Sequence, residues 1–426
     1  MKKIIALTLV LILAVGLFAG CKSSDKGSVY FLNFKPEADS AWQALAKTYT
    51  EKTGVTVKVV TAASGTYETT LTAEMAKKDA PTLFQCGNET ALDTWKDYCL
   101  ALDGTKFLNE MTTSDFNLKG EDGKTYCAGY CYEAFGIIVN TELLEKAGHS
   151  LDEIKDFASL KAVAEDITAR KDELGFAAFS SAGLDSSSSW RFSGHLANMP
   201  LYYEFRDDNV TEQPATITGK YLANYKNIWD LYMNNATCAP SELAAKTGDE
   251  SRAEFANGKA VFFQNGTWEY ANLTDASAMG FSMDPAKLAM IPIYCGVEGE
   301  EKAGLACGTE NCWAVNAKAS EEDQKATLDF MKWVVTSDEG TKMMAEQFGP
   351  IPFKKAKESA NVFFNNLLSE GKYAVTWAFN YTPNVESWRQ GVVDALLAYS
   401  TGSGDWSGVE TAFVDGWATQ YQLQEG

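Results

Sequence analysis

The sequence predicts an α/β protein of two units, each a mainly parallel sheet flanked by helices. Short apolar runs alternate with segments of helical periodicity over the first hundred residues, and the same alternation resumes at Phe135. This alternation is typical of parallel strands joined by helices. No Pro-rich or Gly-rich linker separates the halves, which indicates that the chain crosses between the units more than once.

The first unit is predicted to begin with a strand at 29–33. The helix that follows, 41–52, places Ala41, Leu45 and Tyr49 on one face, and Gly54 ends it. Further strands are predicted at 55–60 and 82–86, and further helices at 70–78 and 91–98.

The second unit is predicted to begin with a strand at 135–139, after which Thr141 caps a short helix that ends at Gly148. Further strands are predicted at 175–180, 258–263, 289–294 and 313–316. Further helices are predicted at 160–171, 222–234, 251–257, 321–336, 339–348, 388–398 and 408–422.

Composition narrows the class of function. The 426 residues carry a net charge of −20, which repels phosphate backbones and argues against nucleic-acid binding. Only His149 and His195 are histidines, so His-based catalysis and His-rich metal sites are disfavoured. Aromatic residues are abundant, with 11 Trp, 18 Tyr and 23 Phe.

The N-terminus is typical of an exported lipoprotein. Lys2 and Lys3 precede a short apolar stretch that ends in Phe-Ala-Gly before Cys21. Residues 1–20 are therefore predicted to be a signal peptide, Cys21 a lipid anchor in the outer face of the cytoplasmic membrane, and 21–28 a polar tether. An ordinary signal peptide with Cys21 retained is the alternative.

Eight further cysteines allow disulfides in an exported chain, and free buried thiols are the alternative. They lack neighbouring histidines and any Cys-x-x-Cys spacing. No metal site and no cofactor are therefore predicted.

Four segments together resemble the family 1 extracellular solute-binding proteins, the maltose-binding-protein class of ABC importers. They are the strand and helix at 29–46, the run FGIIVNTELLEKAG at 135–148, the run FANGKAVFFQNGTW at 255–268, and WAVN at 313–316 followed by a helix and by GPIP at 349–352. The resemblance covers nearly the whole chain after the signal peptide.

The resemblance implies two lobes joined by a hinge, with ligand bound in the cleft between them. It places the N-terminal lobe at 29–134 and 290–336 and the C-terminal lobe at 135–289 and 337–426. It also implies a monomeric binding protein, not an enzyme, that delivers its ligand to the transmembrane subunits of an ABC permease. The candidate ligand-binding residues are Lys35, Glu37, Asn88, Glu89, Glu133, Trp190, Arg191, Trp268, Glu310, Asn311 and Trp388.

These residue types suit a carbohydrate, because a pyranose has an apolar face for indole rings and a rim of hydroxyls for carboxylates and amides. An oligosaccharide is therefore the expected ligand, with a polyol or a sugar acid as the alternative. Each residue also has a structural alternative: a core position for any Trp, a hinge hydrogen bond for Glu133 and a surface ion pair for Arg191. Trp42, Trp229 and Trp333 are expected in the core.

A glycoside hydrolase is the alternative from another class, since it needs only two suitably spaced carboxylates. No catalytic sequence motif supports it.

Overall fold

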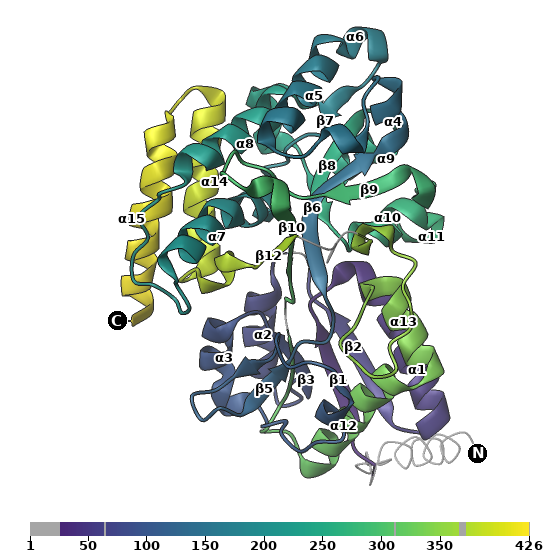
Figure 1. Cartoon of the computed structure of the whole chain (residues 1–426). Helices are drawn as coiled ribbons and strands as arrows, with labels where there is room; N and C mark the ends of the chain where they lie inside the picture. Colours follow the sequence, from purple (N-terminus) through teal and green to yellow (C-terminus); the bar gives the residue numbers. More distant parts are fainter. Residues whose placement is uncertain (1–25, 64, 311, 366–371, 426) are drawn as a thin grey trace, which may run out of the picture.

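The computed structural model has two α/β lobes, one above the other in Figure 1, each built on a six-stranded sheet. The structure describes residues 26–63, 65–310, 312–365 and 372–425. The α/β class and the two-lobed arrangement are confirmed. Within the described residues, no helix combines the length and apolar character needed to cross a bilayer.

The sheet of the first lobe has the strand order β2-β1-β3-β11-β5-β4. Its strands are β1 (Ser28–Asn33), β2 (Thr56–Thr61), β3 (Leu83–Cys86), β4 (Leu118–Lys119), β5 (Thr125–Ala128) and β11 (Cys312–Val315). Its helices are α1 (Asp39–Thr53), α2 (Tyr67–Met75), α3 (Glu89–Trp95), α12 (Glu321–Thr336) and α13 (Asp338–Phe348). Both faces are buried: Phe31 packs edge-on against Trp42, whereas Leu32 joins the cluster on the opposite face.

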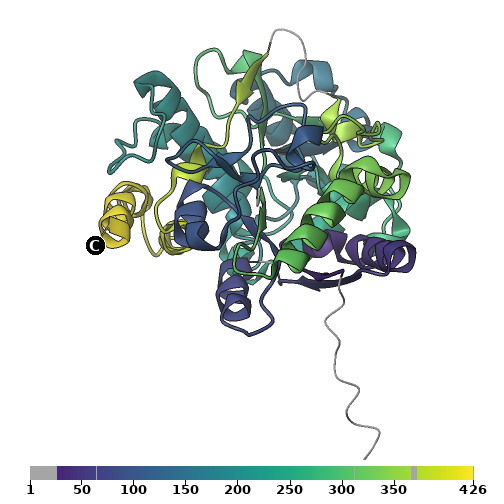
Figure 2. The same cartoon turned by 90° about the horizontal axis from the view of Figure 1, so that it is seen from below.

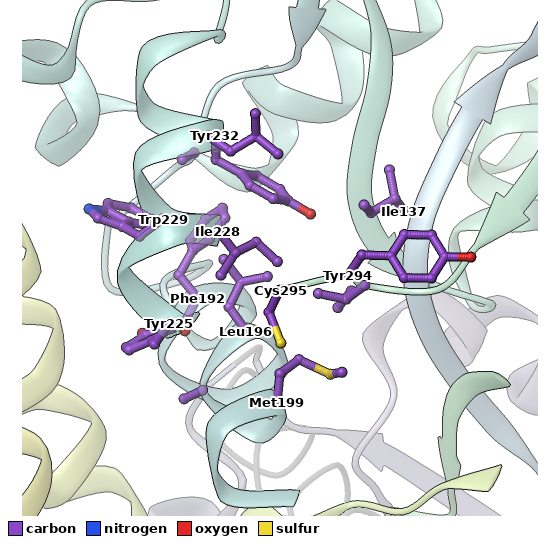
Figure 3. Close-up of a cluster of buried hydrophobic side chains, with 14 of the residues drawn as sticks. Ile137, Phe192, Leu196, Met199, Tyr225, Ile228, Trp229, Tyr232, Tyr294 and Cys295 are labelled. Carbon is purple, nitrogen blue, oxygen red and sulfur yellow. Dashed lines mark hydrogen bonds between the residues drawn. The ribbon is translucent and has the colours of Figure 1, made fainter. Parts of the chain in front are cut away.

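The sheet of the second lobe has the order β12-β10-β6-β8-β7, and β9 also pairs with β6. Its strands are β6 (Glu133–Asn140), β7 (Ala177–Phe179), β8 (Ala260–Gly266), β9 (Leu288–Ile291), β10 (Ala303–Gly308) and β12 (Tyr373–Val375). Its helices are α4 (Thr141–Lys146), α5 (Phe157–Ala169), α6 (Lys171–Leu174), α7 (Ala197–Asp208), α8 (Leu222–Asn234), α9 (Gly248–Ala256), α10 (Glu269–Thr274), α11 (Ala276–Met279), α14 (Val385–Thr401) and α15 (Trp406–Glu425). Figure 3 shows part of the core, where Trp229 and Tyr232 of α8 lie with Met199 of α7.

The strand directions differ from the prediction, because each sheet mixes parallel and antiparallel pairs. In the first lobe β1 is parallel to β2 and β3, but β11 is antiparallel to β3 and β5. In the second lobe β6 is antiparallel to β8, β9 and β10. The reversal arises because β11 enters the first sheet from the second lobe, against the direction of the strands that began there.

The lobe boundaries also differ from the predicted ones. Residues 290–336 were expected in the first lobe, yet β9 and β10 pair with β6 in the second sheet. The helix α13 was expected in the second lobe, but its apolar face packs in the first-lobe core. The chain therefore crosses between β5 and β6, between β10 and β11, and after α13. The first two crossings lie side by side, since Gly308 is paired with Glu133.

The C-terminal helices flank the second lobe. Figure 2 shows α15 at the edge of the molecule, and Figure 1 shows it lying along α14. Val409, Phe413 and Trp417 of α15 are buried in the second-lobe core. Because α15 covers one side of α14, the other side of α14 is free to face the groove between the lobes.

Candidate functional site

Three adjoining cavities form a groove between the lobes, which we call the cleft. The first, about 190 Å³, is lined by Trp190 and Trp268 and is called the aromatic cavity. It shares Glu310 with a middle cavity of about 340 Å³. The middle cavity shares Asn88 with an outer cavity of about 530 Å³. Each cavity has residues of both lobes in its walls, as a site between two lobes requires.

Three rings of the second lobe form one wall of the aromatic cavity. The ring centres of Trp190 and His195 are 5.0 Å apart, and those of Trp190 and Trp268 are 6.0 Å apart. The centre of His195 lies 5.5 Å from that of Trp268. Phe34 of the first lobe and Phe379 add two further rings to the lining. The cavity therefore offers aromatic surface from both lobes.

Hydrogen bonds hold Trp268 just beyond the end of β8. Its Nε1 donates to Oδ1 of Asn265 at 3.0 Å, and Nδ2 of Asn265 donates to Glu269 at 3.0 Å. Glu269 is buried and accepts two bonds from the guanidinium of Arg252, at 2.5 and 2.8 Å. A Cβ on Gly266 would overlap the indole, so glycine lets the ring lie across the strand end. The indole is thus fixed before any ligand arrives.

Trp190 and His195 lie at the two ends of a widened helical turn, Arg191–Leu196, that leads into α7. Trp190 is half-buried, and its Nε1 donates to the carbonyl of Ser187 at 2.9 Å. The ring of His195 stacks on Phe135 of β6 with 4.0 Å between ring centres. Nδ1 of His195 lies 2.9 Å from Nε2 of Gln264. Because an amide nitrogen donates, Nδ1 accepts and the proton of the neutral ring is on Nε2.

Burial, then the positive charges of Arg389 and Arg191, hold the pKa of His195 well below its usual value. The ring is faced by Phe135, Trp190 and Trp268, which carry no charge. Burial lowers the pKa of His149, but its hydrogen bonds to Asp166 and Glu153 outweigh burial, and the net shift is upward.

These opposite shifts predict opposite effects on stability. In the unfolded chain His195 takes up a proton below about pH 6.5, whereas in the native state it does not, so stability falls with falling pH. As the pH falls from about 6.5 to 5.5, wild type should lose about 1 kcal/mol of unfolding free energy through His195, and His195→Gln should not show this loss. Urea unfolding at the two pH values measures it. The matched variant His149→Gln should change the dependence of the unfolding free energy on pH in the opposite direction. The same pH dependence in all three proteins would contradict the assigned burial of His195.

A buried ion pair closes the floor of the aromatic cavity. Lys35, in the loop after β1, pairs through Nζ with Glu133, the first residue of β6. The same Nζ is 4.0 Å from Glu37 and 5.7 Å from the ring centre of Trp268. Burial lowers the pKa of Lys35, but the attraction of Glu133 and then of Glu37 outweighs it, and the net shift is upward. Lys35 is therefore a permanent cation that ties the first strand to the first crossing.

Two carboxyl groups beside this pair bind protons more readily than usual. Burial raises the pKa of Glu37, against the opposing effect of Lys35. Burial and then the charge of Glu133 raise the pKa of Glu310, against Lys35 and Arg389. The backbone N–H of Glu310 donates to Glu133 at 3.3 Å, which joins the two crossings. Glu37 and Glu310 line the cavity, whereas Glu133 lies behind Lys35.

Asn88 and Glu89 lie at the start of α3, between the middle and outer cavities. Oδ1 of Asn88 accepts from the N–H of Ala91 at 2.8 Å and so caps the helix. Its Nδ2 donates to the carbonyl of Asn380 in the second lobe at 3.3 Å. Glu89 is exposed and lines the outer cavity. These residues form the rim of the cleft on the side away from Trp268.

Trp388 and Arg191 do not line any of the cavities, contrary to the prediction. Trp388 is 1% exposed and packs edge-on against Phe413 of α15, with 4.8 Å between ring centres. Arg191 is also 1% exposed, and its guanidinium donates to Ser251 and to backbone carbonyls within the second lobe. Burial lowers its pKa to about 10. In both cases the neighbouring residue, Trp190 or Arg389, lines the cavity instead, because consecutive side chains of a helix point in different directions.

Two further predicted residues, Cys21 and Asn311, lie outside the described residues. Sequence reasoning also missed other side chains that line the aromatic cavity, among them Phe34, His195, Phe379, Glu386 and Arg389. Phe34 precedes the predicted Lys35, and Arg389 follows the predicted Trp388, so the segments were found but not every residue in them.

Arg389 is the most prominent of the missed residues. Its guanidinium lies over the ring of Phe379, 5.2 Å from the ring centre, and 3.8 Å from Glu386. Its Nε is buried and has no hydrogen-bond partner among the described residues. A donor with no acceptor in a cavity wall is suited to a ligand oxygen.

The family comparison gives one match that covers most of the chain. A sequence family described as bacterial extracellular solute-binding protein matches residues 44–364. No curated protein sequence matches the chain.

Solved structures of similar fold cover nearly the whole chain. The binding protein RafE in complex with raffinose has a TM-score of 0.72 at 14% identity, covering 94% of this chain and 100% of that one. A family 1 extracellular solute-binding protein from Bifidobacterium longum subsp. infantis has a TM-score of 0.61 at 20% identity, covering 92% and 100%. A sugar transporter from Bacillus licheniformis in complex with stachyose has a TM-score of 0.66 at 17% identity, covering 92% and 100%. At these identities the likeness concerns the fold.

Proposed function

This chain belongs to the bacterial extracellular solute-binding proteins, and on that premise we propose that it captures a neutral oligosaccharide in the cleft. The observation that carries the proposal is the aromatic cavity, where rings of both lobes surround a small set of charged groups. Indole faces stack on the C–H face of a sugar ring, and the charged groups bond to its hydroxyls. The raffinose and stachyose complexes of similar fold agree with this class of ligand.

The charges favour a neutral ligand over an acidic one. Lys35 and Arg389 are the cations of the aromatic cavity, and Glu37, Glu310 and Glu386 are its acids. Lys35 is already paired with Glu133 beneath the cavity. A ligand carboxylate would therefore meet an excess of negative charge, whereas hydroxyls can both donate to the acids and accept from Arg389.

The size of the cleft favours more than one sugar ring. The middle and outer cavities continue the groove beyond the aromatic cavity and are lined by groups such as Asn88, Glu89 and Asn380. A ligand anchored between Trp190 and Trp268 can extend along these polar walls. Closure of the lobes around it, followed by delivery to an ABC permease, completes the proposed role.

The experiment is a thermal-shift and calorimetry panel of neutral mono-, di- and trisaccharides, with polyols and sugar acids as comparison arms. A ligand that binds only the native state raises the Tm. We expect the largest rise with a neutral saccharide of two or more rings. Preference for a sugar acid would replace the proposed ligand class, and hydrolysis of a saccharide by the purified protein would exclude a pure binding role.

Trp268→Ala should weaken binding of that saccharide by about 1–3 kcal/mol, a roughly 5- to 150-fold rise in Kd, because one stacking surface is lost. Trp268→Phe should retain part of the affinity. Trp333→Ala, which removes a half-buried indole on α12 remote from the cleft, is the matched control and should bind as wild type. Wild-type Kd in Trp268→Ala, measured by calorimetry, would rule out this residue as a platform.

The proposal includes attachment to the membrane through a lipid on Cys21. In a bacterial host, the wild-type protein should then fractionate with membranes, whereas Cys21→Ser should be released. Equal release of both proteins would rule out the lipid anchor without affecting the binding role.

A further inference from the structure

Three cysteines that are distant in the sequence meet in the core of the first lobe. Cys86 ends β3, Cys99 follows the turn after α3, and Cys127 lies on β5. Their Sγ atoms all lie within 4.8 Å of one another. All three are free thiols, and their exposed fractions are 0%, 5% and 0%. This cluster is separate from the aromatic cavity and plays no part in the proposed solute binding.

The spacing of the three sulfurs suits a single metal ion. Metal–thiolate bonds of about 2.3 Å in a trigonal plane place the sulfurs about 4.0 Å apart. The observed upper limit of 4.8 Å requires each side chain to move by less than an ångström. Strands β3 and β5 both pair with β11, so the backbone already holds two of the donors.

The surroundings favour a soft ion. The cluster is packed among apolar side chains, including Leu92 and Trp95 of α3. Among the described residues no histidine or carboxylate completes the set. Thiolate donors select Cu(I), zinc and iron–sulfur centres. Zinc takes a fourth ligand in protein sites, whereas Cu(I) is satisfied by three thiolates.

Metal binding at the cluster releases protons. The ion bonds to thiolates, so it must displace the protons of the three thiols to solvent, which makes binding tighter at higher pH.

We propose that Cys86, Cys99 and Cys127 form a three-thiolate site for one Cu(I) ion. The ion bonds to three sulfurs and keeps its oxidation state, and the displaced protons leave to water. Cys99, the least buried of the three, provides the route of entry. The site lies directly beneath the cleft, because Cys86 is followed by Gly87 and Asn88, which line the middle and outer cavities.

The test is a titration of reduced, anaerobic protein with Cu(I) against a competing chromophoric chelator. We expect wild type to take up one Cu(I) per chain. We expect Cu(I) to bind ~100-fold more weakly to each of the variants Cys86→Ala, Cys99→Ala and Cys127→Ala. Loss of a ligand should cost at least as much affinity as a change in the residues that surround the ligands of a metal site. Cys295→Ala removes a buried thiol of the second lobe and is the matched control that should retain wild-type binding.

X-ray absorption of copper-loaded wild type avoids any question of variant folding. Three sulfur neighbours at about 2.3 Å are expected. Nitrogen or oxygen neighbours, equal binding by the three variants and wild type, or tighter binding of Zn(II) than of Cu(I) would each overturn the proposal. A disulfide joining two of the three thiols in protein purified without reductant would overturn it too. Saccharide binding is measured separately, so either proposal can fail alone.

Discussion

Trp388→Ala is expected to lower the free energy of unfolding by about 3–5 kcal/mol, the usual cost of removing a large buried aromatic side chain. The indole is 1% exposed, lies 4.8 Å from Phe413 and 5.8 Å from Trp417 between ring centres, and donates through Nε1 to the carbonyl of Phe413 at 2.9 Å. Its loss leaves a cavity between α14 and α15 and removes this second bond to a carbonyl that lies within α15. Urea unfolding measures the effect.

The contrast with Trp268 makes this prediction specific. Trp268→Ala should act chiefly on saccharide affinity, and Trp388→Ala chiefly on stability. Trp388→Phe keeps much of the volume and should recover a large part of the loss. If Trp388→Ala unfolds at the wild-type urea concentration and instead raises Kd, the indole faces the cleft as the sequence suggested, and the packing described above is wrong.

Glu133→Gln is expected to cost about 3 kcal/mol of stability, because it leaves the buried ammonium of Lys35 without its main partner. Both side chains are 5% exposed. The loss falls at the lower end of the range for broken buried pairs, since Glu37 stays 4.0 Å from Lys35 Nζ. The measurement is chemical denaturation at neutral pH.

Two controls accompany this variant. Glu339→Gln breaks the exposed pair with Lys52 and should leave stability unchanged within error, as exposed pairs usually do. The double variant Lys35→Met with Glu133→Leu removes both charges and should regain most of the lost stability, because the cost lies in the unpaired charge. A double variant as unstable as Glu133→Gln would show that shape, not charge, matters there.

The sequence predicted the α/β class and the two-lobed arrangement because most strands are strongly apolar and regularly spaced, but it did not predict the lobe boundaries or the strand directions. The prediction of individual elements failed where the sequence signal is weak or where a residue disfavours the element. The strand β10 has the sequence AGLACG, with too few large apolar residues to be recognised, and α7 carries Pro200 within its first turn.

For the site, sequence order identified the right segments but not always the right side chain. Trp388, Val392 and Leu396 are spaced at four residues, and this apolar face was the available signal that Trp388 is buried. The cysteine cluster had no such signal. Spacings of 13 and 28 residues resemble no metal motif, and only the pairing of β3 and β5 with β11 brings the sulfurs together.

The bond from Asn88 to the carbonyl of Asn380 joins the two lobes at the rim of the cleft. A neutral hydrogen bond of this kind contributes about 0.5–1.5 kcal/mol, which shifts an open–closed equilibrium by roughly 2- to 13-fold. The apparent Kd of a ligand scales inversely with the fraction of molecules already in the competent conformation. A change confined to this interlobe bond can therefore alter the ligand concentration needed for half-saturation, while the groups that line the aromatic cavity stay the same.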